Sequence, residues 1–524
     1  MTTDKNTVVD AVGNGDARDP RHVDVLIIGS GFGGLGAAIK LAQDGRYDFV
    51  VIERASEVGG VWRDNTYPGA ACDVPSHLYS YSFELNPNWT RNFSRQSEIE
   101  GYLQQVARKY KVLDRHVFDC EMQSARWNTD TAEWDVVTSK GAYTANTVIS
   151  AVGPLCEPAL PSIPGIEGFT GEIFHSARWN HDSDLTGKRV AVIGTGASAI
   201  QIVPAIAAQV GHMDVYQRTA PWVLPRMDRE YTKLERLAFK WVPGFQRLSR
   251  ALIYLTRETQ VVGLKKPALA IPLQKVAEKH MARQVPDMRL RAKVTPSWRI
   301  GCKRILLSND WYPALQRENV DLVSDGIAEV RSNAVVTTDG TVREVDAIVL
   351  ATGFHVTDSP AYDAITGAGD RTLAEHFREF GMQAYKGTAV AGFPNMFFLI
   401  GPNTGLGHTS LVYMIESQLN YVLDALHTIE REQLATVEVR KEVQDSYNAT
   451  LQRQLKPTVW MTGGCASWYL DAHGNNTTLW PGFTFAFRRL TKHFDLDAYR
   501  STARSERPTA PAGGRLVPTP ARSA

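Results

Sequence analysis

The chain has 524 residues and a mass of 58.1 kDa, with 43% hydrophobic and 22% charged residues. These proportions exclude a mostly disordered or fibrous protein, and the length predicts two or three packed subdomains rather than one core. Lys plus Arg (57) and Asp plus Glu (56) leave a net charge of +1, which argues against a dedicated nucleic-acid-binding protein.

Several other classes of protein also lack support in the sequence. No segment approaches the roughly 18 consecutive apolar residues of a membrane-spanning helix, and the first twenty residues do not resemble a signal peptide. We therefore expect a soluble cytoplasmic protein. The five cysteines form no C-x-x-C pair and the thirteen histidines show no metal-ligand spacing, so we expect no metal site and no dithiol motif.

Both ends of the chain are polar and low in large apolar residues. Residues 1–20 are acidic and contain several Gly and Asp, and residues 501–524 are rich in Pro, Ala, Ser and Arg. Such segments bury too little apolar surface to offset the entropy of ordering them. We expect both to be disordered tails.

The first structured unit is a strand–turn–helix–strand pattern. An apolar run at 23–28 predicts a buried parallel strand, an Ala- and Leu-rich helix follows, and a second strand at 49–52 ends at Glu53. The turn between the first strand and the helix carries Gly29, Gly31 and Gly34. These glycines allow a tight turn, close approach of a pyrophosphate and close helix packing, and Glu53 can bind a ribose diol, as FAD or NAD requires.

A second copy of the pattern begins at residues 189–193. Its turn carries Gly194, Gly196 and Ser198, with Ala199 in place of the last glycine, and its second strand at 213–217 ends at Arg218. In both copies the residue that closes the second strand lies 24 positions after the first glycine. Because a guanidinium suits a 2′-phosphate, Arg218 predicts NADP rather than NAD.

Two further strands, at 147–153 and 346–353, each end in a small residue and a glycine. This ending suits a crossing point where the chain passes close to a bound dinucleotide. Between them, residues 226–302 change to amphipathic helices, with 231–241 and 248–262 as examples, and are distinctly basic. Either this segment faces a membrane or polyanion, or it is a helical cap with a basic solvated side, which we favour.

Four segments resemble the Baeyer–Villiger monooxygenases, a family of flavoproteins, and one of them, residues 392–404, resembles the segment that returns to the flavin domain. Residues 169–180 resemble the family fingerprint F-x-G-x-x-x-H-x-x-x-W-[P/D], although Asn180 replaces the usual Pro or Asp and leaves the substrate class open. Residues 59–73 resemble the segment G-G-x-W-x-x-x-x-Y-P-G-x-x-x-D, and residues 301–304 the loop that carries the active-site arginine. The resemblance covers residues 23–499.

The resemblance implies roles for individual residues. Arg304 is expected to be the main catalytic residue, stabilising negative charge on oxygen, and Asp73 to pair with it and orient it. His175 and Trp179 are expected to connect moving domains rather than act as acid or base. The remaining cofactor contacts that we expect are Gly60, Trp62, Asp73 and Tyr79 for FAD, and Thr219, Lys303 and Trp468 for NADP.

The implied activity is that of an NADPH-dependent monooxygenase containing FAD. In this family a flavin C4a-peroxide, formed with O2, inserts one oxygen atom next to a ketone carbonyl and gives an ester or a lactone. The alternative is a monooxygenase that oxidises sulfur or nitrogen, which would not need Asp73 and Arg304. A noncatalytic NADPH or flavin redox sensor is a third hypothesis.

The predicted fold class is α/β, with two Rossmann-like dinucleotide-binding domains and a helical insert. We expect the FAD domain at 21–152 and 352–500, and the NADP domain at 153–225 and 303–351. The insert at 226–302 then lies between the two parts of the NADP domain.

Overall fold

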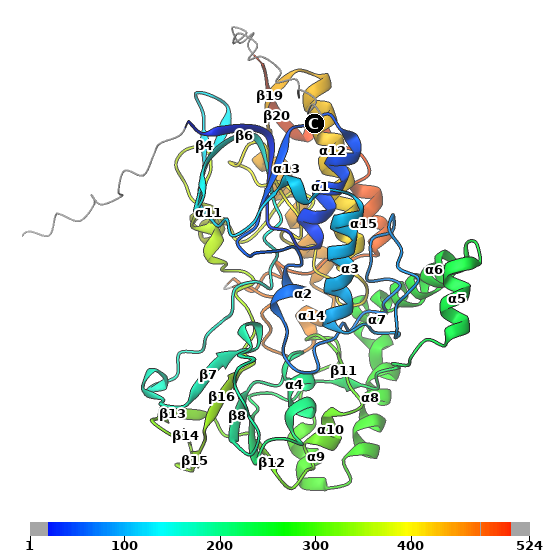
Figure 1. The fold of residues 1–524 in the computed structure, drawn as a ribbon, viewed down its shortest axis with the longest axis vertical. Helices are drawn as coiled ribbons and strands as arrows, with labels where there is room; N and C mark the ends of the chain where they lie inside the picture. The colour runs from blue at the N-terminus through cyan, green and yellow to red at the C-terminus, as the bar shows by residue number, and fades with distance from the viewer. Residues whose placement is uncertain (1–18, 472, 505–524) are drawn as a thin grey trace, which may run out of the picture.

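The structure, a computed structural model, describes residues 19–471 and 473–504. Two β-sheets with helices packed around them occupy opposite ends of the molecule, and a group of helices projects from one side (Figure 1). The α/β class with two Rossmann-like units, predicted from the two glycine-rich patterns, is confirmed. Every helix in the described ranges is too short or too polar to cross a bilayer.

The first sheet has eight strands and is built around β1, which pairs in parallel with β2 and β6. Its strands in spatial order are β17 (Ile365–Thr366), β4 (Met122–Asn128), β5 (Glu133–Thr138), β6 (Gly141–Ser150), β1 (Arg21–Ile28), β2 (Phe49–Ile52) and β3 (His116–Val117), with β18 (Met396–Phe398) beside the end of β6. Helices α1 (Phe32–Asp44), α3 (Gln96–Lys109) and α12 (Leu411–Arg431) share one apolar core with the central strands. The sheet therefore combines residues from both ends of the chain.

The second sheet has five strands, all paired in parallel. Their order is β12 (Val320–Val323), β9 (His212–Tyr216), β8 (Arg189–Ile193), β16 (Ala347–Leu350) and β7 (Glu172–His175). Its core includes α4 (Ala199–Ile206) and α10 (Trp311–Ala314). Because helices cover a parallel sheet, the two strands β8 and β16 consist mainly of buried Val, Ile, Ala and Leu.

The helical insert leaves the second sheet and returns to it at one point. Strand β10 (Val223–Leu224) pairs in parallel with β11 (Leu306–Leu307), and these two short strands close the base of the insert. The insert contains α5 (Lys233–Trp241), α6 (Phe245–Glu258), α7 (Val261–Lys265), α8 (Ile271–Gln284) and α9 (Met288–Val294). Helices α5 and α6 form the part that projects furthest in Figure 1.

The remaining helices and strands lie outside these three groups. They are α2 (Val61–Asp64), α11 (Leu373–Phe380), α13 (Lys441–Leu455), α14 (Val459–Thr462), α15 (Thr484–Leu490), the antiparallel sheet β13 (Ile327–Arg331), β14 (Ala334–Thr337), β15 (Val342–Glu344), and the pair β19 (Leu434–Val439) and β20 (Tyr499–Ala503).

The predicted strands at 23–28, 49–52, 147–153, 189–193, 213–217 and 346–353 all occur, with ends that shift by a few residues. The predicted start of the C-terminal disordered tail is wrong. Residues 501–503, which were expected in that tail, form the end of β20 and pair with β19. Backbone pairing orders this polar segment without any apolar core. Residues 1–18 and 505–524 of the predicted tails lie outside the described residues.

A buried histidine makes the stability of the fold depend on pH. The His376 side chain packs among Phe377, Phe380 and Phe393, and this burial lowers its pKa to about 4. Between the unfolded pKa of about 6.5 and the folded value, only the unfolded chain takes up the proton, so folding stability falls as the pH is lowered.

We predict that His376→Phe weakens this dependence by about 1 kcal/mol per pH unit between pH 6.5 and 4.5. The measurement is the thermal unfolding midpoint across that range, compared with the wild type and with His473→Phe, which removes an exposed histidine. Identical pH profiles for wild type and His376→Phe would contradict the assignment.

Candidate active site

The first glycine-rich turn is packed so closely that side chains cannot be added. Gly29 has φ +95°, and a Cβ there would lie 2.7 Å from the Ala151 carbonyl oxygen. A Cβ on Gly34 would lie 1.8 Å from the Gly29 carbonyl oxygen. Ala151 follows β6, so the 147–153 segment passes directly beside the glycine turn, and its predicted approach to a bound dinucleotide stays a prediction.

A second glycine loop closes against this turn. Gly60 has φ +54°, and a Cβ there would lie 2.9 Å from Cα of Gly31. Gly31 is the N-cap residue of α1 and no side chain caps that helix end. The first N–H groups of α1 are thus left for a ligand in a glycine-lined cradle, which fits the pyrophosphate of a dinucleotide.

Glu53 lies beside the cradle at the end of β2. Its buried carboxylate accepts hydrogen bonds from the N–H groups of Ser30 (2.8 Å) and Ala55 (3.0 Å) and lies 3.1 Å from Nη1 of Arg63. Ser30 is also held from the other side, by Nε2 of His116 at 2.9 Å from its Oγ. A carboxylate has about four lone-pair positions, so one remains for a ribose hydroxyl, the role predicted for Glu53.

The second glycine-rich turn repeats this construction. Gly194 has φ +119°, and a Cβ there would lie 2.4 Å from the carbonyl oxygen of Ala351, which follows β16. Gly196 has open space where its Cβ would be, and Ser198, the N-cap residue of α4, makes no side-chain cap. The N–H groups of Ile200 and Gln201 donate to the carbonyl oxygens of Gly196 and Ser198, so of the first three N–H groups of α4 only that of Ala199 makes no hydrogen bond to a described residue and remains for a phosphate.

Three predicted NADP contacts lie together beside this turn. Arg218 and Thr219 line an open cavity of about 460 Å³, together with Lys293 and Trp298 from the insert. Nζ of Lys303 donates to Oγ1 of Thr219 at 3.1 Å. Partial burial, and then the charge of Arg218, lower the pKa of Lys303, as expected for two cations held close together with no anion between them.

Trp62 and Tyr79 contact each other directly. The Trp62 Nε1–H donates to the Tyr79 hydroxyl at 3.0 Å, and the two rings meet edge to face at 5.5 Å. Phe32, at the start of α1, packs against the Tyr79 ring at 5.2 Å. These aromatic side chains are therefore close to the first cradle, where they were predicted to pack on a flavin.

The central feature is a bidentate ion pair between Asp73 and Arg304. Nε and Nη2 of Arg304 donate to the two carboxylate oxygens at 2.8 and 2.6 Å. Nη1 makes no hydrogen bond to any residue that the structure describes, and the Arg304 side chain is 42% exposed. The guanidinium is thus fixed along one edge and free along the other.

The electrostatics of the pair keep both groups charged. Asp73 raises the pKa of Arg304 further, against the effect of burial. Burial by itself raises the pKa of Asp73, but the Arg304 guanidinium outweighs it and holds the pKa below its usual value. The pair lies next to the aromatic group, because both charges act on the Tyr79 hydroxyl, whose pKa is raised mainly by burial.

Two more arginines surround the pair, and the sequence analysis did not single them out. Nη2 of Arg226 donates to the Cys72 carbonyl oxygen at 3.0 Å, and Arg257 near the C-terminal end of α6 is close enough to interact with Asp73. Both belong to the basic insert. Its surplus of cations was the only signal in the sequence that could have pointed to them.

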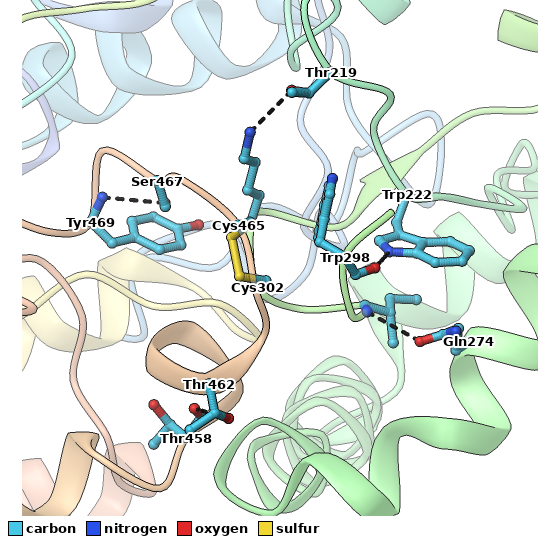
Figure 2. Close-up of a disulfide and its surroundings, with 12 residues drawn as sticks. Thr219, Trp222, Gln274, Trp298, Cys302, Thr458, Thr462, Cys465, Ser467 and Tyr469 are labelled. Atoms are coloured by element: carbon cyan, nitrogen blue, oxygen red, sulfur yellow. Dashed lines mark hydrogen bonds between the residues drawn. A yellow bond between two sulfur atoms is a disulfide. The ribbon is translucent and has the colours of Figure 1, made fainter. Parts of the chain in front are cut away.

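A disulfide joins the Arg304 loop to a distant loop. Cys302 and Cys465 are bonded across 163 residues of sequence, and Figure 2 shows the bond with Tyr469 on one side and Trp298 and Trp222 on the other. No C-x-x-C spacing marks such a pair. Trp468 lies in the tethered loop, 51% exposed and packed edge to face on Tyr469, so a role in covering NADP stays a prediction.

The fingerprint segment 169–180 contributes structure rather than proton transfer. Nδ1 of His175 accepts a hydrogen bond from the Ala177 N–H, and burial lowers the His175 pKa to about 4, so the ring is neutral at physiological pH. Asn180, which departs from the usual Pro or Asp, accepts from the Asp182 N–H at 3.1 Å. An aspartate would make the same turn, so the departure preserves local geometry.

Comparisons with known proteins agree with this geometry. The family model for flavin-binding monooxygenase-like proteins matches residues 22–365. A Baeyer–Villiger monooxygenase of Streptomyces coelicolor is 51% identical over 481 residues (91% of this chain, 92% of that protein), and one of Pseudomonas aeruginosa is 50% identical over 92% of each. The crystal structure of cyclohexanone monooxygenase from Rhodococcus sp. Phi1 bound to NADP+ is similar with a TM-score of 0.84 and 28% identity, covering 93% of this chain and all of that one.

We predict that the disulfide stabilises the site. Cys302→Ser together with Cys465→Ser should remove stabilisation of about 2–4 kcal/mol, because the unfolded chain gains freedom, and should lower the thermal midpoint. Cys156→Ser, which replaces a free, half-buried cysteine, is the control. Equal midpoints for the double variant and the wild type under oxidising conditions would contradict the prediction.

Proposed function

This chain belongs to the flavin-binding monooxygenase-like family, within its Baeyer–Villiger monooxygenases, and on that premise we propose which of its residues carry the reaction. The enzyme uses FAD and NADPH to insert one oxygen atom from O2 next to a ketone carbonyl, which gives an ester or a lactone. We propose that it does so in the cytoplasm. The observation that supports the residue assignment most strongly is the half-free guanidinium of Arg304 on Asp73.

The two cradles suggest how the cofactors are divided. We assign FAD to the first sheet (21–152 and 352–500), where Gly31, Gly60 and Glu53 face one another, and NADPH to the second sheet (153–225 and 303–351). FAD, reduced by NADPH, supplies the activation of O2. The protein supplies binding, orientation and electrostatic stabilisation.

Arg304 is assigned the main catalytic role. When a carbonyl carbon is attacked, negative charge develops on oxygen, and a fixed guanidinium stabilises that charge without giving up its own proton. Asp73 occupies Nε and Nη2, so only Nη1 and the free edge remain for the reacting oxygen atoms. Arg226 and Arg257 increase the positive potential around Asp73 and favour its ionised form.

Arg218, Thr219 and Lys303 are assigned to the 2′-phosphate of NADPH. The three residues are close together although Lys303 follows the insert. The charge of Arg218 disfavours the charged form of Lys303, and such neighbouring cations are typical of an anion site. The neighbouring cavity is lined by both Arg218 and Thr219. The group thus selects NADPH over NADH.

The proposed function is tested by measuring NADPH oxidation by the FAD-loaded enzyme with a panel of cyclic, aromatic and linear ketones. Under ¹⁸O2 the products should be esters or lactones that contain one labelled oxygen atom. If the enzyme oxygenates only sulfides or amines, then the heteroatom-oxidising alternative is correct. NADPH oxidation without any oxygenated product would contradict both.

We predict that Arg304→Ala lowers the rate of ketone oxygenation by about 10² to 10³, the usual effect of removing one preorganised donor. Bound FAD should be retained. The neighbouring exposed residue Arg299 provides a matched control, since Arg299→Ala should leave oxygenation unchanged. Wild-type oxygenation by Arg304→Ala would overturn the assignment.

We predict that Arg218→Gln raises KM for NADPH by about 10- to 100-fold, because a charge-assisted hydrogen bond is lost, with little effect on KM for NADH. Steady-state kinetics with both nucleotides measure the change in selectivity. Arg317→Gln, at an exposed site, is the control. An equal increase of both KM values would mean that Arg218 supports the fold and not the 2′-phosphate.

A further inference from the structure

Helix α6 is oriented with its apolar side toward solvent. Phe245, Leu248, Leu252 and Leu255, spaced by three and four residues, form one stripe, and the three leucines are 56–58% exposed. In a surface helix such a stripe normally faces the protein core. The buried residues of α6 are instead polar, namely Gln246 and Glu258.

The polar contacts of α6 hold it in this orientation. The Arg250 guanidinium donates to the carbonyl oxygens of Leu78 (3.3 Å) and Ser80 (3.1 Å), and Gln246 donates to the Asn86 carbonyl oxygen at 2.6 Å. At the other end, the Glu258 carboxylate accepts from both the N–H and the hydroxyl of Thr484. Rotating the helix to bury its leucines would break these bonds at both ends, so the stripe is a stable part of the surface.

Helix α5 continues the same surface. Leu234 is 78%, Leu237 52% and Trp241 70% exposed, again at helical spacing, whereas Phe239 on the opposite side is buried against Tyr231 and Phe245. We call the seven residues Leu234, Leu237, Trp241, Phe245, Leu248, Leu252 and Leu255 the apolar stripe. It occupies the part of the molecule that projects furthest from the body (Figure 1).

The charges next to the apolar stripe are mostly positive. Residues 231–277 contain nine Lys and Arg but only two acidic residues, Glu235 and Glu258. Glu235 pairs with Arg229, and Glu258 is buried on Thr484. Lys233, Lys240 and Arg247 are exposed and form no ion pair with any described residue.

We propose that the helices α5 and α6 bind the surface of an anionic lipid bilayer, with the apolar stripe inserted among the acyl chains and the basic residues at the headgroups. An apolar face with Leu, Phe and Trp flanked by Lys and Arg is the combination that lies in a membrane interface. A second copy of this chain fits less well, since a symmetric contact would bring these cations against one another. A helical cap with a basic solvated side, the interpretation favoured from the sequence, does not by itself account for the exposed apolar stripe.

The test is flotation of the full-length, FAD-loaded enzyme with phosphatidylcholine vesicles and with vesicles that also contain phosphatidylglycerol. We expect binding to the anionic vesicles only, weakened by salt. The double variant Leu248→Glu, Leu252→Glu should lower binding at least tenfold, and Lys240→Ser or Arg247→Ser about fivefold each at low salt. Bound FAD and activity in solution should not change.

The matched control is Leu160→Glu, which alters an apolar residue of similar exposure outside the insert and should bind as the wild type does. The fluorescence of Trp241 should shift to shorter wavelength with anionic vesicles, and the shift should be lost in Trp241→Phe. Absence of wild-type flotation, or equal flotation of the Leu248/Leu252 double variant, would overturn the proposal. A solution dimer that Leu252→Glu dissociates would also overturn it, because the stripe would then be an interface between two copies.

Discussion

The ion pair between Asp73 and Arg304 connects parts of the chain that are 231 residues apart, and the arrangement of the site depends on it. Asp73 follows the glycine loop that closes the first cradle, and Arg304 follows the helical insert of the second. Three consecutive residues of this loop make three different contacts. Cys302 forms the disulfide, the next residue, a lysine, donates to Thr219, and Arg304 donates to Asp73. A shift of this loop by one residue would separate Lys303 from Thr219 and Arg304 from Asp73.

Positive side chains outnumber negative ones around the Asp73–Arg304 ion pair. Arg226 and Arg257 interact with Asp73 in addition to Arg304, so that one carboxylate faces several cations. In a partly buried site this surplus attracts anions and stabilises negative charge that forms during a reaction. The same holds at Lys303, where partial burial and the nearby charge of Arg218 lower the pKa of the amine, so that an anion bound there would be stabilising.

The sequence predicts local geometry well and long-range arrangement poorly. The glycine turns followed from backbone physics alone, since Gly29 and Gly194 each pack against a crossing strand in a conformation that other residues rarely adopt. The disulfide was not predictable, because nothing in the spacing of Cys302 and Cys465 indicates that their loops meet. Periodicity also shows that α6 has two faces, but only its contacts with Ser80 and Thr484 determine which face is buried.

The composition of the first sheet has a consequence for how the chain is synthesised. Strands β1 and β2 form near the start, but β18 and α12, which complete their surroundings, begin about 340 residues after β2 ends. At ordinary translation rates the ribosome needs roughly 20 to 70 s to supply them. Helices α1 and α3 and strands β4 to β6 cover part of β1 and β2 well before then, but the core of the first sheet stays incomplete until β18 and α12 have been made.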